Sequence, residues 1–228
     1  MNSIRARLEA CADPDYRAFT RKLIPTALPI LGVRTPILKK LVQELVKGDW
    51  RSALASVAND SLEEVHLKGY IIGMAEMLLA EREERIRAFL PLIDNWATCD
   101  GFCSVLKVLG RDRERCWSFL QPCFHSAAPF ERRFAIVMLL NYFLHPEELP
   151  RIFQVFEEIS RQEYYVQMAL AWALSMVYAK FPEPTLAYLQ NCTLEDDILR
   201  KTLQKIRESR QVPAALKKPP LVLPGSKR

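Results

Sequence analysis

The sequence has 228 residues, of which 50% are apolar and 26% are charged, and this length suits one globular domain or one array of repeats. Its seven glycines are too few for the tight turns of a β-sandwich or for glycine loops that cradle phosphate. The formal net charge is +5, but residues 212–228 contribute four basic side chains and no acid. The rest of the chain has 28 basic and 27 acidic residues, so net charge alone does not indicate a nucleic-acid partner.

Helix signals follow one another along the chain. Capping boxes begin at Ser61 and Ser160, and the first predicts a helix from residue 62 through Leu79. Prolines stand where first turns are expected, since a first-turn residue needs no backbone N–H donor: Pro36, Pro129, Pro146 and Pro182. Apolar stretches with helical spacing lie between these signals. We therefore predict an all-α fold of about twelve helices in short-loop pairs.

Signals for a membrane, for export and for a metal are weak. No apolar run reaches the roughly 18 residues of a spanning helix, and the N-terminal stretch turns acidic before any apolar segment of a signal peptide. The six cysteines form no CxxC pair, and the three histidines lie far from ligand spacing. We expect a soluble cytoplasmic protein with reduced thiols and no metal or cofactor. A metal site that includes Cys99 and Cys103 is the alternative.

A faint repeat organises the middle of the chain. Segments that begin at Leu67, Arg133 and Gln167 align without gaps, and an equivalent position falls at Asp100, so the period is 33 or 34 residues. That is the length of one helical hairpin in an α-solenoid. The third residues of these segments are Gly69, Phe102, Ala135 and Ala169. The shared register predicts an acid, a guanidinium and an amide in a row along a concave groove, where solenoids bind ligands.

Trp96 and Asp100 form the most unusual pair in the sequence. They are four residues apart, so on a continuous helix they share one face. An aromatic ring beside a carboxylate suits a site that stacks on a ring and stabilises a developing cation. The alternative is that Trp96 anchors the core and Asp100 caps a helix.

Several other side chains are candidates for binding an anionic partner. Arg132 and Arg133 open a helix, where a guanidinium can grip phosphate, although an ion pair with a neighbouring acid is equally compatible with the sequence. Trp172 could face the groove or the core. Basic clusters that include Arg34 and Lys39 could neutralise a nucleic-acid backbone, although solvated helix faces have the same composition.

Four motifs together carry a resemblance to a known family. They are LGVRTP over Leu31–Pro36, Trp96 with Asp100, Arg133–Ile136, and Gln167–Leu174. In this order and at these spacings, the chain from residue 14 to residue 210 resembles the AlkD-like DNA alkylation repair glycosylases, which are built of HEAT-like helical repeats.

The resemblance implies a glycosylase that removes cationic N3- or N7-alkylated purines from duplex DNA without swinging the base into a tight pocket. Asp100 matches the catalytic carboxylate, Trp96 and Trp172 match the tryptophans that flank the lesion, and Arg133 matches an arginine that contacts the backbone near it. No metal or cofactor is implied. Met168 and Ser175 depart from the family pattern, which commonly has basic residues there.

The resulting interpretation is one HEAT-like repeat domain over residues 1–211 and a basic, proline-rich tail over residues 212–228. We expect a monomer that binds alkylated duplex DNA and contacts no membrane. The further expected backbone contacts are Arg34, Lys39, Arg132 and Gln167. Two alternatives stay open, since fold alone does not determine activity. One is a non-catalytic module that binds distorted or branched DNA, and the other is a scaffold whose groove takes a peptide.

Overall fold

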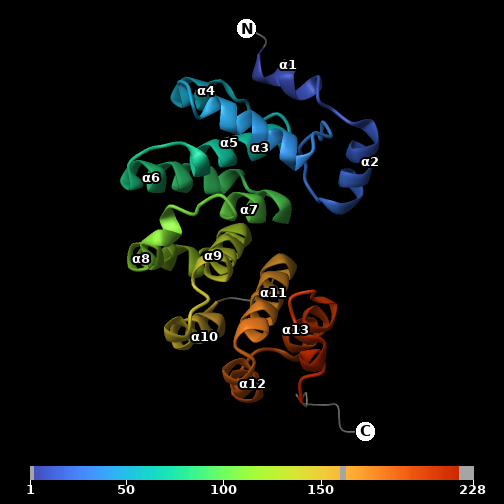
Figure 1. Ribbon diagram of the computed structural model, residues 1–228, viewed down its shortest axis with the longest axis vertical. Coiled ribbons are helices and arrows are strands. Elements are labelled where there is room, and N and C mark those ends of the chain that lie inside the picture. The colour runs from blue at the N-terminus through green and yellow to red at the C-terminus, as the bar shows by residue number, and fades with distance from the viewer. Residues whose placement is uncertain (1–2, 160–162, 221–228) are drawn as a thin grey trace. The chain divides into compact units, whose positions relative to one another are not determined.

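The computed structural model describes residues 3–159 and 163–220, and within these ranges the chain forms thirteen α-helices and no β-strand (Figure 1). It folds as two compact units, Met1–Asp112 and Arg113–Arg228. In the part of the chain that is described, no helix is long and apolar enough to cross a membrane. The predicted all-α fold is confirmed.

Unit 1 contains seven α-helices. They are α1 (Ile4–Glu9), α2 (Pro14–Leu23), α3 (Thr35–Leu45), α4 (Trp50–Ser56), α5 (Leu62–Met74), α6 (Leu79–Phe89) and α7 (Trp96–Cys103), with short 3-10 helices at Leu90–Leu92 and Leu109–Arg111. Unit 2 contains α8 (Arg113–Phe124), α9 (Pro129–Tyr142), α10 (Leu149–Glu158), α11 (Tyr164–Lys180), α12 (Pro182–Asn191) and α13 (Asp196–Glu208), with 3-10 helices at Pro146–Glu148 and Ala214–Leu216.

The predicted helix starts are largely confirmed. The Ser61 hydroxyl accepts a hydrogen bond from the backbone N–H of Glu64 and so caps α5. Residues 160–162 of the second capping box lie outside the described residues, and α11 begins at Tyr164. The four prolines all stand in first turns, at the starts of α3, α9, α12 and the 3-10 helix Pro146–Glu148.

The predicted end of the Ser61 helix is wrong. The helix stops at Met74 instead of Leu79, because Ala75 takes an extended conformation. Arg82 on α6 is buried and donates to the carbonyls of Ile72, Gly73 and Ala75, so it satisfies backbone acceptors at the end of α5. Its partners lie seven to ten residues earlier in the sequence, which a capping pattern does not reveal.

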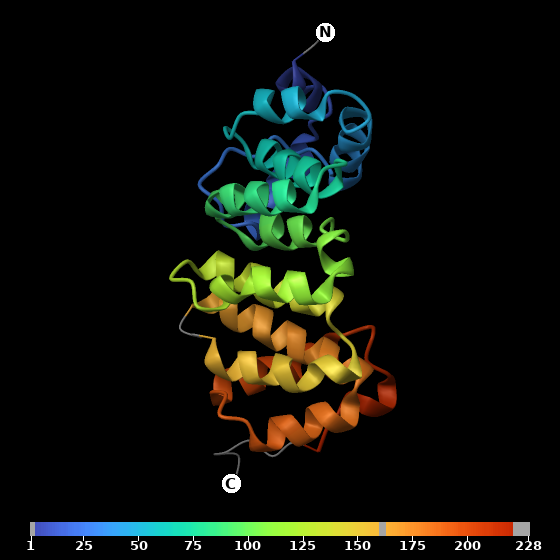
Figure 2. The ribbon, with the colours of Figure 1, turned by 90° about the vertical axis from the view of Figure 1, so that its left-hand side faces the viewer.

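Helix α5 lies at the centre of unit 1 and packs against α3, α4, α6 and α7 (Figures 1 and 2). A Cβ at Gly69 would lie 2.9 Å from the Phe89 ring and 3.2 Å from the Phe102 ring. Gly69 and Phe102 are two of the residues that the repeat alignment makes equivalent, so they meet where α5 packs on α7. A side chain at Gly69 would push these two helices apart.

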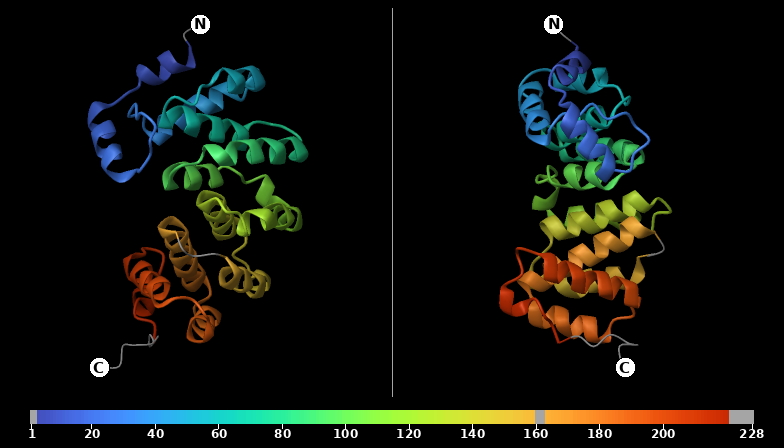
Figure 3. Two further views of the ribbon diagram at one scale, coloured as in Figure 1. Left: turned by 180° about the vertical axis from the view of Figure 1, so that it is seen from behind. Right: turned by 90° about the vertical axis from the view of Figure 1, so that its right-hand side faces the viewer.

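Unit 2 is built around α9 and α11, which pack against each other, while α8 packs on α9 and both α12 and α13 pack on α11 (Figure 3). Ala135 and Ala169, the other small residues of the alignment, are fully buried. Each unit therefore consists of stacked helical hairpins, as the α-solenoid prediction requires. The assignment of residues 1–211 to one domain and the concave groove stay predictions.

Candidate functional site

Unit 1 contains a cavity of about 380 Å³ in which the two most unusual residues of the sequence meet. Trp96 and Asp100 both line it. Side chains from three other helices complete the wall: Tyr16 and Thr20 from α2, Thr35 and Lys39 from α3, and Glu63, His66 and Tyr70 from α5. Two carboxyl groups, an indole, two phenols, an imidazole and an ammonium group thus border one space.

The start of α7 explains how Trp96 and Asp100 come together. Asn95 caps the helix, because its side-chain oxygen accepts a hydrogen bond from the Thr98 N–H at 2.9 Å. Trp96 is then the first helical residue, and Asp100 follows one turn later on the same face. The Trp96 Nε1–H donates to the carbonyl of Leu23 at 3.3 Å, which joins α7 to the end of α2. The predicted Trp96–Asp100 face is therefore present.

A chain of side-chain hydrogen bonds links the start of α7 to α5 and to the loop after α2. The Asn95 amide donates to Thr98 Oγ1 at 2.9 Å and to Asp94 at 2.6 Å. Asp94 in turn accepts from the Thr26 hydroxyl at 2.6 Å. His66 Nε2 lies 2.9 Å from Thr98 Oγ1. The Thr98 hydroxyl has one proton and two lone pairs, so the tautomer of the imidazole decides which of the two groups donates in this bond.

Burial shifts two of the titratable groups that line the cavity. It lowers the pKa of His66 to about 4, against a smaller opposite effect of the Asp94 carboxylate, so the imidazole is neutral at pH 7. Burial also raises the pKa of Tyr70 to about 12, although a hydrogen bond with Thr35 acts in the other direction. Tyr70 therefore stays a hydrogen-bond donor, and its hydroxyl would be 2.9 Å from a Cβ at Gly101.

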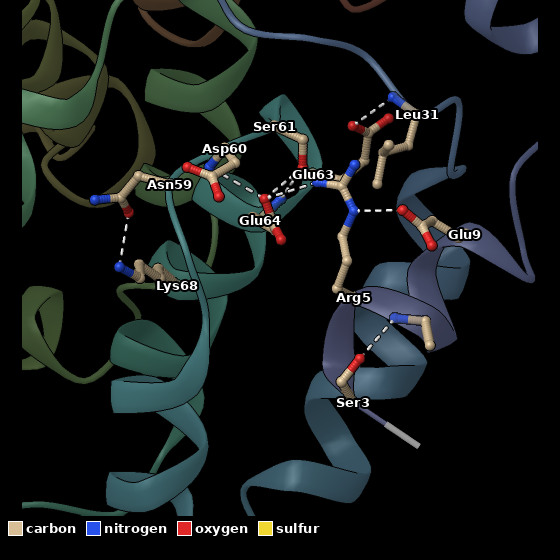
Figure 4. Close-up of polar contacts among 11 residues, drawn as sticks. Ser3, Arg5, Glu9, Leu31, Asn59, Asp60, Ser61, Glu63, Glu64 and Lys68 are labelled. Carbon is tan, nitrogen blue, oxygen red and sulfur yellow. Dashed lines mark hydrogen bonds and ion pairs between the residues drawn. The ribbon is translucent and has the colours of Figure 1, made fainter.

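The LGVRTP segment owes its shape to Glu63. This buried carboxylate accepts hydrogen bonds from the backbone N–H groups of Leu31, Gly32 and Val33, at 2.9, 2.7 and 3.1 Å. Figure 4 shows the bond from Leu31. Gly32 has a φ of +94°, a conformation that favours glycine, and a Cβ there would lie 2.4 Å from the Asp13 carbonyl oxygen. The segment holds Val33 and Thr35 at the cavity wall.

Of the two predicted backbone contacts in unit 1, Lys39 lies in the cavity wall, with its Nζ 5.6 Å from the centre of the Tyr70 ring. Arg34 is exposed, forms an ion pair of 2.8 Å with Asp13, and stacks its guanidinium over the Tyr16 ring at 4.6 Å. The backbone N–H of Tyr16 and the Arg34 guanidinium lower the pKa of Asp13. Both cations therefore border aromatic rings that line the cavity.

The predicted residues of unit 2 have different surroundings. Arg132 and Arg133 are each 5% exposed. Arg132 pairs with Glu163 and donates to the Ser126 carbonyl, while Arg133 donates to the Tyr165 carbonyl at 2.8 Å. Both arginines thus hold backbone or acidic groups of their own unit.

Helix α11 carries the remaining predicted residues, Gln167 and Trp172. Both are partly buried. The Gln167 side-chain oxygen accepts a hydrogen bond from Lys201 Nζ on α13 at 3.3 Å. Ser175, one of the departures from the family pattern, is buried and donates to the Trp172 carbonyl at 2.7 Å. The structure brings Trp96, Asp100 and Lys39 to one cavity of unit 1, and it places Arg132, Arg133, Gln167 and Trp172 in unit 2.

Comparison with protein families gives the site its context. The model of a family described as DNA alkylation repair enzyme matches residues 4–211. The chain belongs to this DNA alkylation repair enzyme family. Membership implies that DNA is its partner, and the match spans all the residues discussed above except the end of the chain. No curated protein matches the sequence.

Sequence reasoning missed the residues of α5 that line the cavity with polar groups: Glu63, His66 and Tyr70. They are spaced by three and four residues on α5, so they share one helix face. That spacing is the signal that could have found them. It was hidden because apolar residues surround them on a helix that is buried on nearly every side.

Proposed function

We propose that this repair enzyme is a DNA glycosylase that excises cationic N3- or N7-alkylated purines from duplex DNA without flipping the base into a pocket. One observation carries the proposal: Trp96 and Asp100 lie one turn apart on α7 and line the same cavity, in a chain of the DNA alkylation repair family. The chain would act as a monomer in the cytoplasm, without a metal or cofactor.

The chemistry of such a lesion suits a sparse site. An alkylated purine is already positively charged, so it departs as a neutral base with the electron pair of the C1′–N bond and needs no general acid. The sugar becomes oxocarbenium-like, as in glycoside hydrolysis. Water then adds to C1′ and releases a proton. The Asp100 carboxylate stabilises the cation and orients the water, while the Trp96 ring offers its negative face to the same charge.

The expected size of the Asp100 contribution follows from electrostatics. Two unit charges about 4 Å apart attract by about 4 kcal/mol at an effective dielectric of about 20. If this attraction exists in the transition state and not in the ground state of the sugar, it accelerates the reaction by about a thousandfold.

The other predicted residues are proposed to hold the DNA. Trp172 would contact the lesion from unit 2, and Arg133 would contact the backbone near it. Arg34, Lys39, Arg132 and Gln167 are the remaining proposed backbone contacts. Lys39 has the best support, because its side chain lines the same cavity as Asp100.

The test is release of base from a duplex that contains one N7-methylguanine. Wild type should release the base above the spontaneous rate, and Asp100→Asn should lose most of this acceleration while it still binds the duplex, since the amide keeps the shape and removes the charge. Asp197→Asn is a matched control, because Asp197 is an exposed partner of Arg200 in unit 2. It should behave as wild type.

Two results would contradict the proposal. Full activity of Asp100→Asn would remove Asp100 from the mechanism. Binding by all three proteins with no release of N7-methylguanine or N3-methyladenine would instead support a non-catalytic module that binds distorted DNA.

A further inference from the structure

The row of equivalent positions on successive helices continues beyond Gln167. Leu67, Asp100, Arg133 and Gln167 are 33, 33 and 34 residues apart, and another step of 34 residues leads to Lys201. Lys201 lies on α13, which packs along α11, the helix of Gln167 (Figure 3). The periodicity of the sequence therefore assigns a lysine to the last helix of the series.

A direct contact supports this register. The Lys201 Nζ donates to the Gln167 side-chain oxygen at 3.3 Å across the α11–α13 interface. The two residues are thus neighbours in space as well as equivalent in the repeat. Lys201 is partly exposed, so its ammonium group is within reach of a ligand on the surface of unit 2.

The charge of Lys201 distinguishes it from the cations around it. Arg200 pairs with Asp197 at 3.0 Å, and Lys205 pairs with Glu208 at 3.7 Å. In the described part of the chain, Lys201 has no carboxylate within ion-pair distance, and its hydrogen-bond partner is a neutral amide. Its positive charge is therefore not offset, whereas a phosphate group could offset it.

We infer that Lys201, together with the amide of Gln167, forms a binding site on unit 2 for a phosphate of the DNA backbone. A lysine contacts phosphate as a point charge and reads no base, so the site adds affinity for any duplex. The inference rests on the DNA-binding part of the proposed function, and it does not depend on whether the enzyme excises a base.

The physics of counterion release fixes the expected effect. Each phosphate neutralised on B-DNA contributes about 0.9 to the slope of log K against log salt concentration. Loss of one such contact should therefore lower that slope by about 0.9 and weaken binding by about eightfold at about 0.1 M salt. The deficit should shrink as salt approaches about 1 M.

The experiment measures binding of an undamaged fluorescent duplex by anisotropy over a salt series. Lys201→Gln should lower the slope and the affinity by these amounts, while Lys201→Arg should keep both near wild type. Lys205→Gln is the matched control, because it removes the same charge one turn further along α13 from a lysine that already has a carboxylate partner. It should have the smaller effect.

An unchanged slope in Lys201→Gln, or an equal loss in Lys205→Gln, would overturn the inference. Circular dichroism of the variants would separate a lost contact from a lost fold. Because the duplex is undamaged, binding to it does not depend on base excision. A wild type that binds this duplex but releases no base from a duplex with N7-methylguanine or N3-methyladenine would contradict the proposed glycosylase and leave this inference standing.

Discussion

The neutral His66 makes the stability of unit 1 depend on pH in a way that can be calculated. Its pKa is about 4 in the folded protein, whereas a solvated histidine of the unfolded chain has a pKa of 6.5. Below pH 6.5 His66 becomes protonated in the unfolded chain, whereas in the folded protein it stays neutral until about pH 4. Stability is therefore lost as pH falls through this window, and the contribution is constant below it.

The magnitude follows from the two pKa values. Integration between pH 7 and pH 4.5 gives a loss of about 2.4 kcal/mol in the free energy of unfolding from His66 alone. The folded state also lowers the pKa of some carboxyl groups, such as Asp13, Asp49 and Glu81. Protonation of these groups at low pH likewise reduces the free energy of unfolding. A variant is therefore needed to isolate the histidine.

The assay is urea unfolding of wild type and His66→Gln at both pH values, with tryptophan fluorescence as the signal. Glutamine can keep a hydrogen bond to Thr98 and does not titrate, so the variant should lose about 2 kcal/mol less than wild type between pH 7 and pH 4.5. A direct NMR titration of the imidazole should give the pKa of about 4. Equal losses in the two proteins, or an imidazole pKa near 6.5, would refute the reasoning.

Two further substitutions test the segments that support residues of the cavity wall. Gly32→Ala places a Cβ 2.4 Å from a carbonyl oxygen at a φ of +94°, so it should lower the free energy of unfolding by more than about 1 kcal/mol. The control is Gly48→Ala, whose Cβ would meet nothing closer than 3.9 Å and which should change this free energy by less than about half that amount. Similar melting temperatures for the two variants would contradict this account. Thr98→Val breaks the hydrogen bonds of Thr98 Oγ1 to His66 and Asn95, so it should reduce the rate of base release at saturating DNA. Thr98→Ser keeps the hydroxyl and should restore this rate. Equal rates in the two variants would show that these bonds do not position α7.

Helix starts were predictable from the sequence because the signals are local. A cap or a first-turn proline acts on backbone groups within three or four residues, as at Ser61 and Pro129. The Trp96–Asp100 face was predictable for the same reason, since four residues make one helical turn. The end of α5 was not, because the side chain that satisfies its carbonyls, Arg82, comes from the next helix.

Positions on the cavity wall depended on contacts between distant segments. Glu63 accepts hydrogen bonds from the backbone of Leu31–Val33, about thirty residues earlier in the sequence. No pattern within α5 indicates that partner. His66 is linked to Thr98 over 32 residues, close to one repeat period. The period identifies which helices are neighbours, but it does not show which atoms meet between them.

Burial also separates basic residues that spacing treats alike. Arg132 and Arg133 stand at a helix start, where the sequence favours phosphate binding, yet both are 5% exposed. The N-terminal end of α11 supplies their partners, the N-cap residue Glu163 and the Tyr165 carbonyl. Lys201 lies at the far end of the same repeat series with a neutral partner. A cation binds an external anion more strongly when no internal acid competes for it, because an existing ion pair would otherwise have to be broken first. Partner identity therefore distinguishes Arg132, which pairs with the Glu163 carboxylate, from Lys201, whose partner is a neutral amide.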